Sequence, residues 1–200
     1  MDVRKATDAD AGLVAAILAE AFDDDPLLRW LFPDGRRRSG LISRYFRTTA
    51  ESLYLRHREV YLVGESGTAM WLPPGVSTDS LPLLAWLTLF WRMLLAEGFS
   101  GLRRARLAAE VMKTNYPGEP HFYLHAIGVR KSEQGKGIGS GLLGHVVRRC
   151  DLEGKLAYLE NSNPRNTPLY ERHGFRIVGQ WMAPEGPPLW FMRRQPGVRG

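Results

Sequence analysis

Three glycines within five positions are the most chemically suggestive feature of this 200-residue chain. They lie in Gln134-Gly135-Lys136-Gly137-Ile138-Gly139-Ser140, between a predicted strand and a predicted helix. Glycines leave backbone N–H groups open to close approach, and the start of a helix adds free N–H groups and the positive end of its dipole. The segment therefore predicts an anion site that suits a pyrophosphate.

Two other phosphate-binding loops fit this segment less well. The P-loop spacing, glycine, four residues and then Gly-Lys-Ser/Thr, is absent from the sequence. Gly139, Gly141 and Gly144 match the dinucleotide fingerprint, and Glu160 ends the next strand as a ribose-binding acid would. That match lies inside the predicted helix, however, and the first half of the chain shows no run of β-α-β units. We therefore expect no dinucleotide site.

The spacing Gln134-x-x-Gly137-x-Gly139 resembles the Gln/Arg-x-x-Gly-x-Gly/Ala signature of the GNAT N-acetyltransferases. The strand and the helix that this signature requires are predicted at His121–Val129 and 137–150. Residues 159–175, with an asparagine-bearing turn, Tyr170 and then Gly-Phe, resemble the second GNAT signature. The sequence of this segment looks closest to that of the subgroup that contains puromycin N-acetyltransferase.

The resemblance implies the fold and the activity. The expected class is α/β (α+β), a GNAT fold with a central mixed, mostly antiparallel sheet whose fourth and fifth strands splay apart, flanked by helices. Residues 1–200 would form one domain, in which residues 1–118 mainly build the acceptor pocket and residues 119–194 bind acetyl-coenzyme A. The implied reaction is acetyl transfer to a primary amine of a small molecule by direct attack on the thioester, without a metal.

The same resemblance assigns the groups that hold acetyl-coenzyme A. The backbone of Ile127, Gly128 and Val129 would pair with the pantetheine arm. The pyrophosphate would lie on the glycine loop, with Gln134 supporting it; the loop residues are Gly135, Lys136, Gly137, Ile138, Gly139 and Ser140. Asn163 and Asn166 both fit the asparagine that contacts pantetheine in relatives, and their alternative role is turn formation and helix capping.

Amide formation from a thioester requires two proton movements. The amine loses a proton, and the departing thiolate benefits from gaining one. The family places Tyr170 beside the sulfur, so Tyr170 is the candidate general acid, or else a tyrosine that only packs against the sheet. The base stays open between Glu160, whose pKa burial would raise, His125 on the preceding strand, and a chain of waters.

The acceptor is less well defined by sequence. Asp23, Asp24 and Asp25 lie in a loop that would attract a cationic amine or form a solvated turn. A set of aromatic residues would line the pocket or form ordinary core: Trp30, Phe32, Trp86, Phe90 and Trp91. Two alternatives to a small-molecule enzyme remain, a protein or peptide N-acetyltransferase acting on lysine or an N-terminus, and a non-catalytic acyl-CoA-binding regulator.

Composition and charge indicate which partners and which cellular compartment to expect. The net charge is +6, yet the basic residues are scattered and no nucleic-acid-binding motif is evident, so we expect no nucleic-acid partner. The single cysteine, Cys150, indicates a reducing compartment, and we expect a cytoplasmic protein. The apolar stretch Leu81–Ala96 contains Arg92 and is too short to span a bilayer, so it predicts a buried or pocket-lining helix and no membrane partner. Many relatives dimerise, so a homodimer is also expected.

Overall fold

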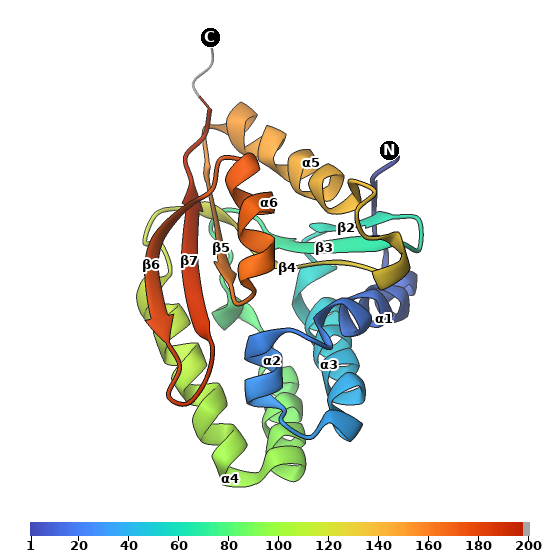
Figure 1. Ribbon diagram of the computed structural model, residues 1–200. Helices are drawn as coiled ribbons and strands as arrows, with labels where there is room; N and C mark the ends of the chain where they lie inside the picture. Colours follow the sequence, from blue (N-terminus) through green and yellow to red (C-terminus); the bar gives the residue numbers. More distant parts are fainter. Residues whose placement is uncertain (198–200) are drawn as a thin grey trace.

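One mixed sheet runs through the part of the protein that the structure, a computed structural model, describes, which is residues 1–197 (Figure 1). Its strand order is β1-β2-β3-β4-β5-β7-β6, and all neighbours are antiparallel except β4 and β5. The fold class expected from the sequence is therefore confirmed. The strands are β1 (Arg4–Lys5), β2 (Val60–Val63), β3 (Gly67–Leu72), β4 (His121–Val129), β5 (Leu156–Asn161), β6 (Arg176–Met182) and β7 (Pro188–Arg194).

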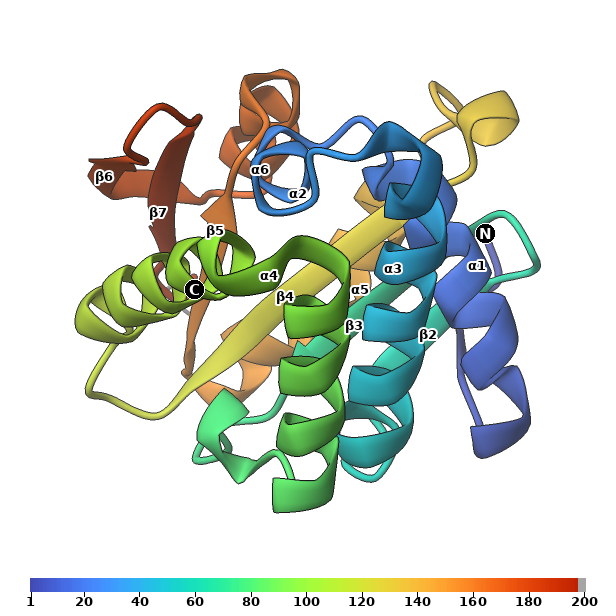
Figure 2. The same ribbon diagram turned by 90° about the horizontal axis from the view of Figure 1, so that it is seen from below.

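Helices cover both faces of the sheet. The first four, α1 to α4, lie on one face, and α5 and α6 lie on the other (Figures 1 and 2). Successive residues of β5 alternate between the two cores, because Tyr158 packs with α1 and α3 whereas Leu159 packs with α5. The helices are α1 (Ala11–Phe22), α2 (Pro26–Leu31), α3 (Gly35–Thr49), α4 (Leu83–Asn115), α5 (Ile138–Glu153) and α6 (Thr167–Arg172).

Side-chain caps explain why the chain between Phe22 and Thr49 forms two helices. Asp25 accepts hydrogen bonds from the backbone N–H groups of Leu27 and Leu28, and Pro26 occupies the first helical position of α2. Asp34 caps α3 in the same way through the N–H of Arg36. The two caps therefore fix where α2 and α3 begin.

A glycine divides α4. Gly98 has φ 64° and ψ −158°, which breaks the helix into residues 83–97 and residues 99–115. A left-handed φ is easy for glycine and strained for other residues, so the elbow falls at this position. The apolar stretch Leu81–Ala96 is helical from Leu83 onward, as expected, and Figure 2 shows the two arms turned away from each other.

Pairing between β4 and β5 stops halfway along β4. The parallel register runs from His121 opposite Leu156 to Leu124 opposite Leu159, and no further pair follows. On the other side of β4, Trp71 pairs with Leu124 and Met70 pairs with Ala126, so His125 is an extra residue. Such a bulge bends its strand and re-aims a side chain. The bulge therefore lies at the point where the two strands part.

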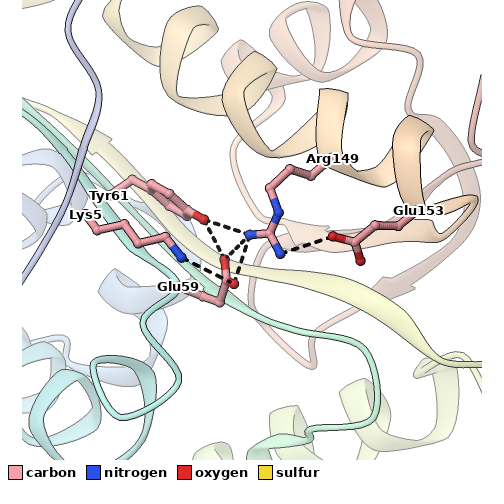
Figure 3. A network of polar contacts seen from close by, with 5 residues as sticks. All are labelled: Lys5, Glu59, Tyr61, Arg149 and Glu153. Carbon is pink, nitrogen blue, oxygen red and sulfur yellow. Dashed lines mark hydrogen bonds and ion pairs between the residues drawn. The ribbon is translucent and has the colours of Figure 1, made fainter.

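A buried ion-pair network fixes α5 against the sheet (Figure 3). Arg149 of α5 donates to both carboxylate oxygens of Glu59, at 2.9 and 2.8 Å, and to the hydroxyl of Tyr61 at 2.9 Å. Tyr61 donates in turn to Glu59 at 2.6 Å, and Lys5 approaches the same carboxylate at 3.9 Å. Only 6% of the Glu59 side chain is exposed, so its charge depends on these partners.

We expect Arg149→Met to lower the free energy of unfolding by about 3 kcal/mol, because it leaves the Glu59 carboxylate buried without its main cation. The matched control is Arg148→Met, which removes the same charge from an exposed position on the same helix. Urea unfolding of the two variants measures the difference. Equal and small effects of both substitutions would show that the network does not hold α5 in place.

Candidate active site

A narrow cavity of about 30 Å³ lies where β4 and β5 part. Residues of both strands line it, together with α6 and the turn that precedes α6. The polar ones are Asp25, His125, Glu160, Asn161, Ser162, Asn166 and Tyr170, and Ile127 borders it as well. The structure therefore brings together the three candidate catalytic residues, Tyr170, Glu160 and His125, which come from three different elements.

A larger cavity, of about 300 Å³, lies on the face covered by α1 to α4. Its walls are mostly apolar, with Leu28, Leu89 and Met93 among them. It shares five lining residues with the narrow cavity: Phe22, Asp25, His125, Glu160 and Ser162. The two cavities therefore meet at Glu160 and His125, so a molecule in the larger cavity can reach a group held between the strands.

Glu160 lies where the two cavities meet, and the pKa of its carboxyl group is shifted. Burial raises the pKa of Glu160 to about 7, although the hydroxyls of Tyr123 and Tyr158 act in the opposite direction. Its Oε1 atom has no hydrogen-bond partner within residues 1–197. A carboxyl with this pKa exchanges its proton near neutral pH, which suits a general base.

His125 is held in a ring of tyrosines. The Tyr45 hydroxyl lies 3.2 Å from Nε2, the Tyr123 hydroxyl lies 3.5 Å from Nδ1, and the Tyr54 ring stacks on the imidazole at 4.9 Å. Burial lowers the pKa of His125 to about 4, so the imidazole is neutral at neutral pH. Because both of its nitrogens face hydroxyls, His125 is better placed to orient Tyr45 and Tyr123 than to take a proton.

Tyr170 of α6 reaches the narrow cavity from the opposite side of the sheet. Burial, with the nearby charge of Asp25, raises the pKa of Tyr170 well above its usual value. The hydroxyl therefore stays protonated at neutral pH and can donate a hydrogen bond or a proton. Its ring packs on Phe175 at 6.2 Å, so the packing role also holds and does not exclude the chemical one.

The two candidate asparagines in the turn after β5 have different surroundings. Asn166 lines the narrow cavity, whereas Asn163 does not border it. The Asn163 side chain instead accepts a hydrogen bond from the N–H of Arg165, which caps the short 3₁₀ turn Pro164–Asn166. Asn161, which the sequence reading did not single out, also lines the cavity and donates to Thr167 at 3.0 Å.

The glycine loop has the geometry of an anion cradle. Gly135 and Gly137 both have φ of 79°, and open space lies where their side chains would be. Successive N–H groups in such a conformation form a concave anion site. The Gln134 amide donates to the carbonyl of Val129 at 3.2 Å and so ties the loop to β4. A side chain at Gly139 would make only ordinary contact with Leu169, so alanine fits there.

The remaining loop residues have protein partners. Lys136 pairs with Glu133 at 3.0 Å, and the Ser140 hydroxyl lies 2.7 Å from Nε2 of His173. The Ile138 side chain is buried in the core, so only its backbone N–H can serve a ligand.

Beyond the splay, the backbone of Ile127 and Val129 has no partner on β5. Gly128 lies between them for a different reason. A side chain there would come within 2.8 Å of Ala21, so the glycine allows α1 to pack on the sheet. Apart from the Val129 carbonyl, which accepts from Gln134, the edge of β4 beyond Leu124 has no partner on β5. That Ile127, Gly128 and Val129 pair with the pantetheine arm stays a prediction.

The acidic and aromatic residues that were candidates for the acceptor pocket lie in different surroundings. Asp25 is buried at the cavity junction, and its carboxylate receives the hydroxyl of Ser162, whereas Asp24 pairs with Lys131 at 2.9 Å. Phe32 and Trp86 line the large cavity. Trp30 instead packs on Trp181, and Phe90 and Trp91 are exposed.

Sequence reasoning missed Tyr45, Tyr123 and Ser162 as site residues. Tyr123 lies two positions before His125 on β4, so a shared strand face was a usable signal for it. Tyr45 comes from α3 and Ser162 from the turn after β5, and no spacing within either segment connects them to β4.

Comparison with known proteins agrees with this geometry. Residues 97–175 match the model of the Acetyltransferase (GNAT) family. A protein named as an uncharacterized N-acetyltransferase of Schizosaccharomyces pombe is 27% identical over 190 residues, covering 88% of this chain and 74% of that protein.

Solved structures show the same fold. The structure titled histone acetyltransferase HPA2 and related acetyltransferase, from Corynebacterium glutamicum, matches with a TM-score of 0.72 and 25% identity, over 98% of this chain and 97% of that one. Arylalkylamine N-acetyltransferase 2 from Aedes aegypti matches with a TM-score of 0.60 over 97% of this chain and 98% of that one. At 11% identity, the second likeness shows the fold alone.

We expect Gly137→Glu to weaken acetyl-coenzyme A binding at least a hundredfold, because the new carboxylate occupies and repels the anion site. The matched control is Gly154→Glu. Gly154 ends the same helix, also with a positive φ and open space, so it carries a similar backbone strain far from the loop. Calorimetric titration measures both affinities. Equal losses in the two variants would remove the loop from the binding site.

Proposed function

Because the chain belongs to the GNAT acetyltransferase family, we propose that it transfers the acetyl group of acetyl-coenzyme A to the primary amine of an apolar small molecule. The observation that supports the acceptor class is the cavity of about 300 Å³, which is lined mainly by apolar side chains and meets the splay at Glu160. A protein or peptide substrate would need an open groove, whereas this cavity lies beneath α2, α3 and α4.

Acetyl-coenzyme A supplies the acetyl group as a thioester. The glycine loop would hold its pyrophosphate, and the free edge of β4 at Ile127 and Val129 would hold the pantetheine arm. Asn166 and Tyr170 line the narrow cavity where the strands part, so that cavity would take the thioester end. None of these groups lines the large cavity, which would leave that cavity to the amine.

Glu160 would act as the general base. Its carboxylate would accept, directly or through water, the proton that the neutral amine loses as its nitrogen attacks the thioester carbonyl carbon. A C–N bond forms, the C–S bond breaks, and the sulfur leaves with the electron pair of that bond. Tyr170 donates a proton to the sulfur, and its phenolate is reprotonated from solvent as Glu160 releases the proton that it took.

His125 would have a positioning role in this scheme. Its neutral ring holds Tyr45 and Tyr123, and Tyr123 in turn faces Glu160. Asp25 would serve the acceptor end only indirectly, because its two carboxylate oxygens are occupied by the cap of α2 and by Ser162. An amine at the junction would instead meet Glu160, whose Oε1 atom has no hydrogen-bond partner within residues 1–197.

The pH dependence of kcat tests the base. Below about pH 7 Glu160 is protonated and cannot accept a proton, so kcat should rise with pH through about 7 and then level off. Glu160→Gln should lower kcat about a hundredfold and abolish this rise. His125→Gln is the control and should keep the rise, because His125 is already neutral. A profile that loses the rise only in His125→Gln would make the histidine the base.

An amine panel tests the acceptor class. With acetyl-coenzyme A saturating, phenethylamine and octylamine should be acetylated with a higher kcat/KM than spermidine or a lysine-containing peptide. Ala105→Phe narrows the large cavity and should raise KM for the apolar amines about tenfold. Ala96→Phe, on the same helix but outside the cavity lining, is the matched control.

Three outcomes of the panel have distinct meanings. Faster acetylation of the peptide than of any small amine would establish the protein-directed alternative. Tight acetyl-coenzyme A binding with no acetylation of any amine would favour a non-catalytic acyl-CoA-binding regulator. Equal effects of Ala105→Phe and Ala96→Phe would show that the cavity does not receive the acceptor.

A further inference from the structure

The first arm of α4, residues 83–97, exposes a continuous apolar stripe. Leu84, Leu87, Trp91 and Leu95 follow helical spacing along one side, and Phe99 continues the stripe across the elbow at Gly98. We name these five residues the α4 apolar face. Leu84, Leu95 and Phe99 are each about four-fifths exposed, at 79%, 80% and 83%. Large apolar side chains gathered in this way mark an interaction surface.

The opposite side of the same arm is engaged. Leu89 and Met93 line the large cavity, and Arg92 donates to the hydroxyl of Thr48 on α3 at 2.8 Å. The arm is therefore fixed to the body of the protein and is apolar on both sides. Its outer side is left uncovered by the described residues.

The helix does not suit a membrane span, although residues 83–115 are long and apolar enough to be considered for one. Gly98 breaks it, and the unbroken arm of residues 83–97 is only about 22 Å long at 1.5 Å per residue. The hydrocarbon core of a bilayer is about 30 Å thick. An arm of this length that is fixed to the protein by its inner side and apolar on its outer side suits the membrane interface, where a helix lies in the plane of the surface.

Charge around the elbow points to an anionic partner. The acids nearest to it are already paired, Glu97 with Arg104 at 3.5 Å and Asp34 with Arg37 at 3.6 Å. Arg36 and Arg103 are exposed and form no ion pair within residues 1–197. The elbow therefore carries unpaired cations together with Leu95 and Phe99, which are exposed on either side of Gly98. This combination binds anionic headgroups and the upper acyl region of a bilayer.

We propose that the α4 apolar face docks this protein peripherally on an anionic lipid bilayer. The arm lies along the surface, Leu84, Leu95 and Phe99 enter the boundary between headgroups and acyl chains, and Arg36 and Arg103 contact anionic headgroups. This surface is separate from the acetyl-transfer site. The proposal therefore goes beyond the proposed function and is tested independently of it. It also departs from the expectation of no membrane partner, because the sequence does not reveal that the stripe is exposed.

Flotation with lipid vesicles tests the docking. The protein should float with phosphatidylcholine vesicles that contain phosphatidylserine and much less with phosphatidylcholine alone, and added salt should weaken the binding. Leu84→Glu and Leu95→Glu should each reduce binding at least tenfold, and Arg103→Glu should reduce it and flatten the salt dependence. Val178→Glu, at an exposed apolar position on β6, is the control and should bind like the wild type.

Titration with acetyl-coenzyme A shows that each variant is folded, because none of these residues lines a cavity or the glycine loop. Wild-type protein that does not float with phosphatidylserine vesicles at low salt would overturn the proposal. So would equal binding by wild type, Leu84→Glu and Leu95→Glu. A dimer in sedimentation equilibrium that both glutamate variants dissociate, together with no vesicle binding, would instead assign the face to a second copy of this chain.

Discussion

The end of backbone pairing between β4 and β5 is the constraint on which the rest of the site depends. Backbone N–H and C=O groups need partners when they are buried, so two adjacent strands part only where something else replaces the missing hydrogen bonds. Here β3 keeps β4 paired on one side, while one extra residue at His125 bends the strand away from β5 on the other. The gap leaves a free strand edge, a narrow cavity and a way through the sheet from one helical layer to the other.

Burial at this gap shifts the pKa values of two neighbouring groups in opposite directions. A low-dielectric surrounding disfavours whichever form is charged, so it raises the pKa of the Glu160 carboxyl to about 7 and lowers the pKa of the His125 imidazole to about 4. One physical effect thus produces a carboxyl group that titrates near neutral pH beside an imidazole that is already neutral there. The tyrosines around the pair keep their protons, since burial also raises the pKa values of Tyr123 and Tyr170.

Sequence predicted those parts of the protein that are encoded by local pattern. The bounds of β4 and the start of α5 follow from hydrophobic alternation and from the glycines that precede the helix. The splay and the grouping of Tyr170 with Glu160 came from the family resemblance, because the two residues lie on different elements. The bulge at His125 was not predicted, since Leu-His-Ala in a strand carries no sign of an extra residue.

Exposure was the other quantity that sequence could not supply. The apolar run in α4 has leucines and aromatics on every side, so its periodicity cannot show which side meets the protein. The choice between Glu160 and His125 as base also depends on burial by α1 to α4, which no local pattern encodes. Asn163 and Asn166 fit one motif equally well, and only the path of the turn separates a capping residue from one that borders the cavity.

The strand order gives the protein a particular course during synthesis. β7 lies between β5 and β6, so the edge of β5 stays open after β6 has been made and is closed only when residues 188–194 have left the ribosome. Glu160 is on that edge, opposite Phe191 of β7. An open strand edge can pair with other chains, and β6 could occupy the place of β7 before it arrives. The arrival of β7 therefore both completes the surroundings of Glu160 and covers an edge that is open to aggregation.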